Sequence, residues 1–142
     1  MNTKDLKELD YFIRGYLEAL IWTGFDEADM HLEEHDDVGG FTLHSMIYTS
    51  IECKNFLDRT YGLIISASTQ GEYAAQSGYG SYSHKLFSLA GHDFLLTRNG
   101  HGAGFWDRNI GDTGETLTEI AKTFGPVMAY IGDGNRIDID AA

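Results

Sequence analysis

Hydrophobic residues recur every three or four positions at the start of the chain, which is the period of an amphipathic helix. Thr3 can cap such a helix, Asp5 suits its first turn, and Gly24 suits its end. We therefore predict a helix over residues 3–24 that packs one face on the core. That face consists of Leu6, Leu9, Ile13, Tyr16, Leu17, Leu20 and Ile21.

A second helix is predicted to begin near Thr49 and to run towards Ile64 or Ser68. Thr49 and Glu52 have the spacing of a capping box, in which each side chain bonds to the backbone of the other residue. Cys53 falls inside this helix, and we expect it to be a small buried side chain rather than a nucleophile.

The C-terminal part of the chain changes from a helical period to an alternating one. A third helix is predicted to begin at Asp112 or Thr113 and to end at Gly125. Two strands follow, over residues 127–131 and 136–140, joined by a glycine-rich turn. The core stripe of the third helix is Leu117, Ile120, Ala121 and Phe124.

The stretch GHDFLLTRNGHGAGFWDR, residues 91–108, is interpreted as a β-hairpin. Phe94 and Thr97 favour a strand, and Asn99-Gly100 supplies residues that a tight reversal needs. Trp106 lies on the return strand, where it would anchor the sheet. The residues assigned to this structural hairpin are His92, Arg98, Gly100, Gly102, Gly104, Trp106, Asp107 and Arg108.

Together these elements predict the α+β class in a single domain spanning residues 1–142. The C-terminal half has the order ββαββ, which gives a small, mainly antiparallel sheet with a helix on one face. The N-terminal helices should cover the rest of that sheet.

Composition narrows the class of protein. The single cysteine excludes an internal disulfide framework, and no apolar run approaches the ~20 residues that span a bilayer. The first ten residues lack a signal-peptide pattern. We expect a cytoplasmic protein without a membrane segment and with no cofactor. The net charge of −12 disfavours direct nucleic-acid binding, which normally needs a basic face.

An acidic segment lies between the first two predicted helices, and residues 15–53 hold no Lys or Arg. Mutual repulsion of the carboxylates favours a solvated loop. Such a surface suits a basic partner, and we select it as the candidate partner-binding site. Its residues are Asp26, Glu27, Asp29, Glu33, Glu34, Asp36 and Asp37.

Two alternatives would make the protein an enzyme or a metal-binding protein. His31, Glu34 and His35 match an inverted zinc-protease pattern, although a short pattern in an acidic loop arises easily by chance. The second alternative uses the histidines and aspartates of residues 91–108. Against it, His92 and Asp93 would face opposite sides of a strand.

A structural role fits residues 91–108 better. In that role, Arg98 or Arg108 would form a salt bridge with Asp93, Asp107 or Asp112.

Residues 91–134 resemble a family of small acidic proteins encoded by tailed bacteriophages and related mobile elements. The shared signature is HDFxLTRNGHGAGFWDRG, then GxxLTxxAKxFG, then a strand that ends in GDDG. The similarity extends to YLEALIW at residues 16–22. This chain departs from the signature with Asn109 and with Gly125-Pro126, both at turns. The resemblance implies a phage origin and a host cytoplasm, and it fixes no reaction.

These observations favour a phage-encoded acidic interaction protein. It would act as a nucleic-acid mimic that inhibits a host defence or nucleic-acid-processing protein, so its partner would be a basic, nucleic-acid-binding protein. A third alternative is an accessory protein that self-associates through the tyrosine-rich residues 69–90, because tyrosines among small residues suit contact surfaces.

Overall fold

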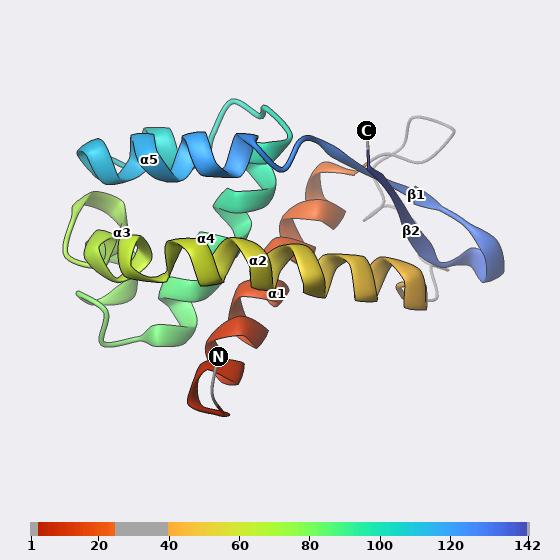
Figure 1. The fold of residues 1–142 in the computed structure, drawn as a ribbon, viewed down its shortest axis with the longest axis horizontal. Coiled ribbons are helices and arrows are strands. Elements are labelled where there is room, and N and C mark those ends of the chain that lie inside the picture. Colours follow the sequence, from red (N-terminus) through yellow and green to blue (C-terminus); the bar gives the residue numbers. More distant parts are fainter. Residues whose placement is uncertain (1–2, 25–39, 142) are drawn as a thin grey trace.

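The structure, a computed structural model, describes residues 3–24 and 40–141 (Figure 1). The first helices in this part of the chain are α1 (Thr3–Thr23), α2 (Leu43–Ala67) and α3 (Gly71–Ser77). They are followed by α4 (Ser83–Arg98), the short 3-10 helix η2 (Phe105–Asp107) and α5 (Gly111–Lys122). The chain then forms β1 (Val127–Ile131), the 3-10 turn η3 (Asp133–Asn135) and β2 (Ile137–Ala141).

The predicted α+β class is confirmed, with a small antiparallel sheet at the C-terminus. Strands β1 and β2 pair antiparallel, with Val127 opposite Ala141 and Ile131 opposite Ile137. The hairpin lies at one end of the molecule, beyond the helices (Figure 1). The prediction of β1 matches its observed bounds, and the observed β2 begins and ends one residue later than predicted.

The predicted hairpin at residues 91–108 is wrong, and with it the first two strands of the ββαββ order. Residues 83–98 form helix α4, followed by a loop that contains η2. The physical reason is burial on all sides: residues 93–98 of α4 are all buried. A helix enclosed in this way has no polar face, so its sequence lacks the period that reveals a helix.

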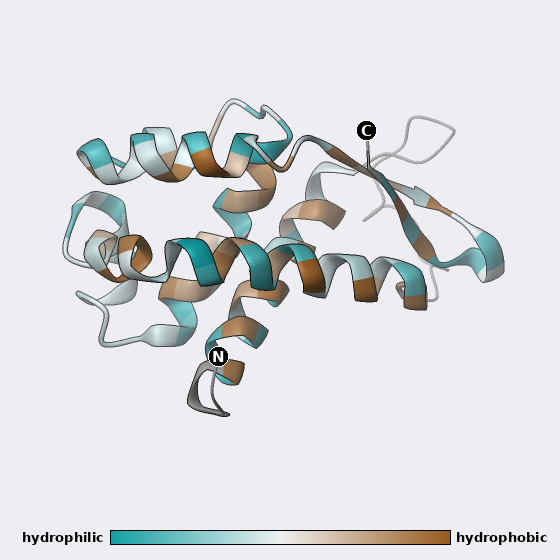
Figure 2. Ribbon diagram, in the orientation of Figure 1, coloured by the Kyte–Doolittle hydropathy of each residue, from teal (hydrophilic) through white to brown (hydrophobic). Residues whose placement is uncertain are grey.

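The start of α2 was also predicted too late. Thr42 is the observed N-cap, and its hydroxyl accepts a hydrogen bond from the Ser45 amide. Thr49 lies buried inside the helix instead of capping it. Figure 2 shows hydrophobic residues along the first half of α2, but several of them are exposed, whereas the buried Ser45 and Thr49 are polar, which obscures the helical period. The exposed ones are Leu43, Ile47 and Ile51.

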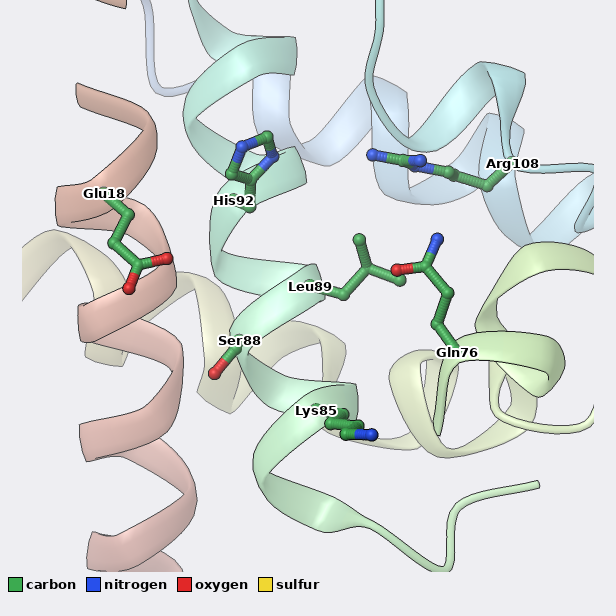
Figure 3. A pocket seen from close by; sticks show the side chains of 7 residues that line it. All are labelled: Glu18, Gln76, Lys85, Ser88, Leu89, His92 and Arg108. Carbon is green, nitrogen blue, oxygen red and sulfur yellow. The ribbon is translucent and has the colours of Figure 1, made fainter. Parts of the chain in front are cut away.

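Helices α1 and α4 cross in backbone contact. A Cβ atom added at Gly15 would overlap the carbonyl oxygen of Ser88, and one added at Gly91 would overlap the carbonyl oxygen of Phe12. Only glycine allows two helices to approach so closely. This crossing places α1 directly beside the face of α4 that carries Ser88 and His92 (Figure 3).

Aromatic rings fill the space between α2, α4 and η2. The rings of Phe56 and Phe94 stack with their centroids 4.1 Å apart, and Phe105 stacks on Phe56 at 5.8 Å. Trp106, which we expected to anchor a sheet, is 53% exposed, whereas its neighbour Phe105 is fully buried. The anchor of this segment is therefore Phe105.

Cys53 is fully buried in α2, which confirms the expectation from the sequence. Burial raises the pKa of its thiol well above the ordinary value, so the thiolate is disfavoured. No helix within residues 3–24 and 40–141 is long and apolar enough to cross a membrane.

Candidate functional site

Arg98, at the end of α4, is enclosed by the protein. Its side chain is 0% exposed, and its Nε donates to the Gly125 carbonyl oxygen at 2.7 Å while Nη2 donates to that of Phe124 at 3.0 Å. Nη1 donates to the Tyr16 hydroxyl at 3.2 Å, and Nη2 lies 3.3 Å from Glu52 Oε1. Arg98 therefore binds the chain that leaves α5, with Glu52 rather than a nearby aspartate as its ion-pair partner.

Arg108, ten residues later, forms the other buried ion pair. Its Nη2 donates to Asp93 Oδ1 at 2.8 Å and its Nε to Asp93 Oδ2 at 3.0 Å, which confirms one of the predicted pairings. The Tyr73 hydroxyl donates to Asp93 Oδ2 at 2.7 Å, and Arg108 Nη1 donates to Glu72 at 3.2 Å. Asp93 is fully buried, so this pairing fixes the guanidinium in place.

The packing around Asp93 determines the charge states of the two side chains that donate to it, Arg108 and Tyr73. Hydrogen bonding to the Asp93 carboxylate raises the pKa of Arg108 above its ordinary value. Burial, and then the same carboxylate, raise the pKa of Tyr73 well above its ordinary value. Tyr73 is therefore a neutral donor, and Arg108 keeps its charge at any physiological pH.

A pocket of about 380 Å³ opens beside this ion pair (Figure 3). His92, on α4, and Arg108 lie at one end of it, and the guanidinium points toward the imidazole. Lys85 lies at the other end, almost two turns earlier on α4. The residues that line the pocket are Glu18, Gln76, Lys85, Ser88, Leu89, His92 and Arg108.

His92, which lines this pocket, has a buried nitrogen without a hydrogen-bond partner among the described residues. This nitrogen, Nδ1, lies 3.9 Å from Asp93 Oδ1. The expectation that His92 and Asp93 would face opposite sides is wrong, because consecutive residues of a helix are only about 100° apart. The imidazole also lies 5.9 Å from the ring of Trp22 on α1.

His101 does not join His92. It lines a separate pocket of about 240 Å³ between the end of α1 and the start of β1, where Leu20 and Met128 also lie. The two histidines of the predicted hairpin therefore do not share a site, which removes the version of the enzyme hypothesis that combined them.

The remaining residues of the predicted hairpin shape the loop after α4. The Gly104 amide donates to Asp107 Oδ1 at 3.0 Å, which closes the turn at η2. A Cβ atom at Gly104 would overlap the Thr97 hydroxyl, so the loop requires glycine there. Gly100 adopts a left-handed φ of 70°, and Gly102 is exposed.

Sequence reasoning missed the residues that complete the pocket from other helices. Gln76 comes from α3 and Glu18 comes from α1, outside residues 91–108 of the chain. Tyr73, also on α3, binds Asp93 but does not line the pocket. Lys85 precedes that stretch on α4 itself. The sequence offered one indication of this site, the predicted ion pair between Asp93 and Arg108, because a buried ion pair is often found beside a binding pocket.

The acidic residues selected as the partner-binding site, at positions 26, 27, 29, 33, 34, 36 and 37, lie outside the described residues. The zinc candidates His31, Glu34 and His35 lie outside them as well. Within residues 3–24 and 40–141, no group of three or more His, Cys, Asp or Glu side chains is arranged to hold a metal ion.

Among the described residues, α5 carries a row of carboxylates on its outer surface. Asp112, Glu115 and Glu119 are exposed and follow one another at steps of three and four, so they share one side of the helix. Leu117 and Ala121 face the core on the opposite side. The row therefore presents negative charge to solvent.

The pocket beside His92 offers hydrogen-bond donors and cations rather than a prepared nucleophile. The Ser88 hydroxyl donates to the Tyr11 carbonyl oxygen at 3.3 Å, and the Cys53 thiol is buried in the core. Such a set of groups can bind and orient a ligand. Comparisons of this chain with protein families, with curated proteins and with solved structures find no match.

Proposed function

We propose that this chain is a phage-encoded, non-enzymatic interaction protein whose acidic surface binds a basic, nucleic-acid-binding host protein and competes with nucleic acid for it. The observation that carries the proposal is the partition of charge. The chain has 22 Asp and Glu against 10 Lys and Arg, and the fold uses several of those cations internally.

Within the part of the chain that the structure describes, four Lys and Arg side chains form ion pairs with carboxylates. Arg98 and Arg108 form buried or nearly buried ion pairs, as described above. At the surface, Arg14 lies 3.1 Å from Asp10, and Lys54 lies 2.6 Å from Asp58, each pair one helical turn apart. Pairing of the cations leaves the surplus carboxylates to set the sign of the surface potential.

The row on α5 gives part of this surface a regular spacing. With a rise of about 1.5 Å per residue, Asp112 and Glu115 are about 4.5 Å apart along the helix axis, and Glu115 and Glu119 about 6 Å. Duplex DNA carries one charge per roughly 1.7 Å of axis, spread over two strands. The carboxylates of the α5 row and of the acidic segment at residues 26–37 both contribute negative electrostatic potential, which would attract a basic groove.

Competition with DNA tests the proposal directly. The full chain is immobilised, bacterial lysate is applied at low salt, and bound proteins are eluted first with duplex DNA at constant salt and then with a salt step. We expect basic, nucleic-acid-binding proteins in the DNA eluate, because both ligands occupy the same groove. Mass spectrometry identifies the eluted proteins.

Matched variants locate the surface. Replacing all seven acids of residues 26–37 by their amides should abolish retention, and Glu115→Gln with Glu119→Gln should weaken it. The control for the α5 double variant is Asp133→Asn with Asp140→Asn, which removes the same two charges from the hairpin, where both residues are exposed. If DNA releases none of the retained proteins while salt releases all of them, the chain does not mimic nucleic acid.

A further inference from the structure

We propose that the pocket beside His92 binds the phosphate group of a small molecule. The phosphate would sit between Arg108, His92 and Lys85, and this site is separate from the acidic surface that the proposed function uses. In a chain with a net charge of −12, three of the side chains that can carry positive charge converge on one pocket.

Arg108 has donors to spare. A guanidinium has five N–H groups, and the Nε–H and one Nη2–H are taken by Asp93 while one Nη1–H goes to Glu72. Two N–H groups remain at the outer end, which points toward His92 in Figure 3. Asp93, itself bound by Tyr73, holds the opposite edge, so the outer end is already oriented, and the side chain is still 17% exposed. A fixed guanidinium is the usual partner of a phosphate oxygen.

His92 supplies the second contact and independent support for a ligand. Buried polar atoms are nearly always hydrogen-bonded in folded proteins, and an unpaired one costs free energy. The Nδ1 of His92 is buried without a partner in the described part of the chain. The imidazole lines the pocket, and with a small rotation of the ring a phosphate at the outer end of Arg108 would offer an oxygen or a hydroxyl to this nitrogen.

Lys85 and Gln76 supply donors on the far side of the phosphate position. Lys85 is exposed, and its Nζ lies over the Tyr82 ring at 5.0 Å, a contact that the ammonium can exchange for one with an anion in the pocket. Figure 3 shows the Gln76 amide between Arg108 and Lys85. Donors from three directions suit a tetrahedral oxyanion better than a planar carboxylate.

Glu18 indicates which chemical groups the rest of the ligand carries. It extends from α1 on the other side of α4 from Arg108 and Gln76 (Figure 3), so it does not compete for the phosphate. Its carboxylate would accept hydrogen bonds from hydroxyl groups of the ligand. A pocket of about 380 Å³ has room for a small phosphorylated polyol or sugar.

The overall negative charge does not oppose this binding. At physiological ionic strength, electrostatic interactions are screened over about 8 Å, so a small anion in the pocket responds mainly to the groups around it. Asp93 and Glu72 lie within that distance, but both are paired with Arg108, and Lys85 adds positive charge on the opposite side. A nucleic acid would extend far beyond the pocket and meet the acidic surface. The ligand is therefore small.

Calorimetric titration of the full chain tests the site with three probes: inorganic phosphate, glucose 6-phosphate and glucose. We expect saturable binding of a phosphate probe and none of glucose. Tighter binding of glucose 6-phosphate would assign the site to phosphate esters, and equal binding would assign it to free phosphate. Trp22 reports the location, because binding beside His92 should change its fluorescence in a Trp106→Phe background.

Two variants and one control test the assigned contacts. Lys85→Met should weaken phosphate binding about tenfold, since each charge-assisted hydrogen bond contributes at least that factor. Lys122→Met removes the same charge from exposed α5 and should leave binding unchanged. His92→Phe should also weaken binding about tenfold while the melting temperature stays equal or rises, because the unpaired buried nitrogen is removed.

The proposal is overturned if no phosphate probe binds at about 10 mM, well above the millimolar affinities expected for a small anion. It is also overturned if Lys122→Met weakens binding as much as Lys85→Met, since binding would then depend only on net charge. The contact with His92 is overturned if His92→Phe lowers the melting temperature and leaves phosphate binding intact, because His92 would then have only a structural role.

Discussion

Arg98 and Arg108 belong to the same short stretch of sequence, yet the fold uses them in opposite ways. Arg98 is 0% exposed, and its donors end on carbonyl oxygens, a hydroxyl and a carboxylate of the protein. Arg108 is held equally firmly by Asp93, but its outer end faces a pocket. A buried guanidinium serves as a structural element when the protein encloses it, and it can serve as a binding element when its remaining donors face a pocket.

The largest effect should come from breaking the closed network. Arg98→Met should lower the free energy of unfolding by about 3–5 kcal/mol, because it leaves Glu52 and two carbonyl oxygens without their partner in the interior. Urea denaturation followed by circular dichroism measures the loss. A loss below about 1 kcal/mol would mean that the network contributes little to stability.

The anchor of the loop that carries Arg108 should be almost as sensitive. Phe105→Ala removes a fully buried ring and should cost about 3–5 kcal/mol. Trp106→Ala, at the adjacent position, should cost at most about half as much, because 53% of Trp106 is already exposed. The same denaturation measurement compares the two. Equal losses would contradict the assignment of Phe105 as the anchor.

Alkaline pH should weaken both arginine networks through their tyrosines. Burial raises the pKa of Tyr16, beside Arg98, and of Tyr73, beside Asp93, above the usual value of 10.0. Above pH 10.0 the unfolded chain loses these protons while the folded protein keeps them. Stability contributed below that pH is therefore lost as the pH rises, by up to about 1.4 kcal/mol per pH unit for each tyrosine.

Absorbance at 295 nm and circular dichroism, followed together from pH 8 to pH 12, test this prediction. Tyr73→Phe should flatten the dependence on pH above 10.0. Ionisation of all eight tyrosines at one ordinary pKa, with the fold intact, would contradict it.

The smallest effect should be at the histidine that does not face Arg108. His101→Ala should change the free energy of unfolding by less than about 0.5 kcal/mol, as surface substitutions usually do. It should also leave phosphate binding unchanged, since His101 lines a different pocket. Weaker phosphate binding in this variant would show that the two pockets are coupled.

The sequence was sufficient to predict the positions of helices and strands that expose one face to solvent. Helices α1 and α5 each show a clear apolar stripe, and β1 alternates before a glycine turn, so their positions were predicted to within a few residues. The ion pair between Asp93 and Arg108 was also among the predicted pairings. Such features depend on local patterns or on opposite charges that lie close in the chain.

The central helix could not be predicted in this way. Residues 93–98 of α4 are all buried, so local β-propensity at Phe94 and Thr97 decided the interpretation wrongly, and tertiary packing overrides that propensity. The pocket was missed for a related reason. Glu18 and Gln76 reach it from helices whose positions are known only once α4 is placed.

The crossing of α1 and α4 at Gly15 and Gly91 has a consequence for redesign. Because the two backbones are in direct contact, no side chains lie between them whose size could change the spacing. The distance between Glu18 on one helix and His92 on the other is therefore set by the main chain. Substitutions in the pocket lining would then change which chemical groups it accepts without altering its width. Selectivity at this site should be tunable one side chain at a time, within a frame that the two glycines keep constant.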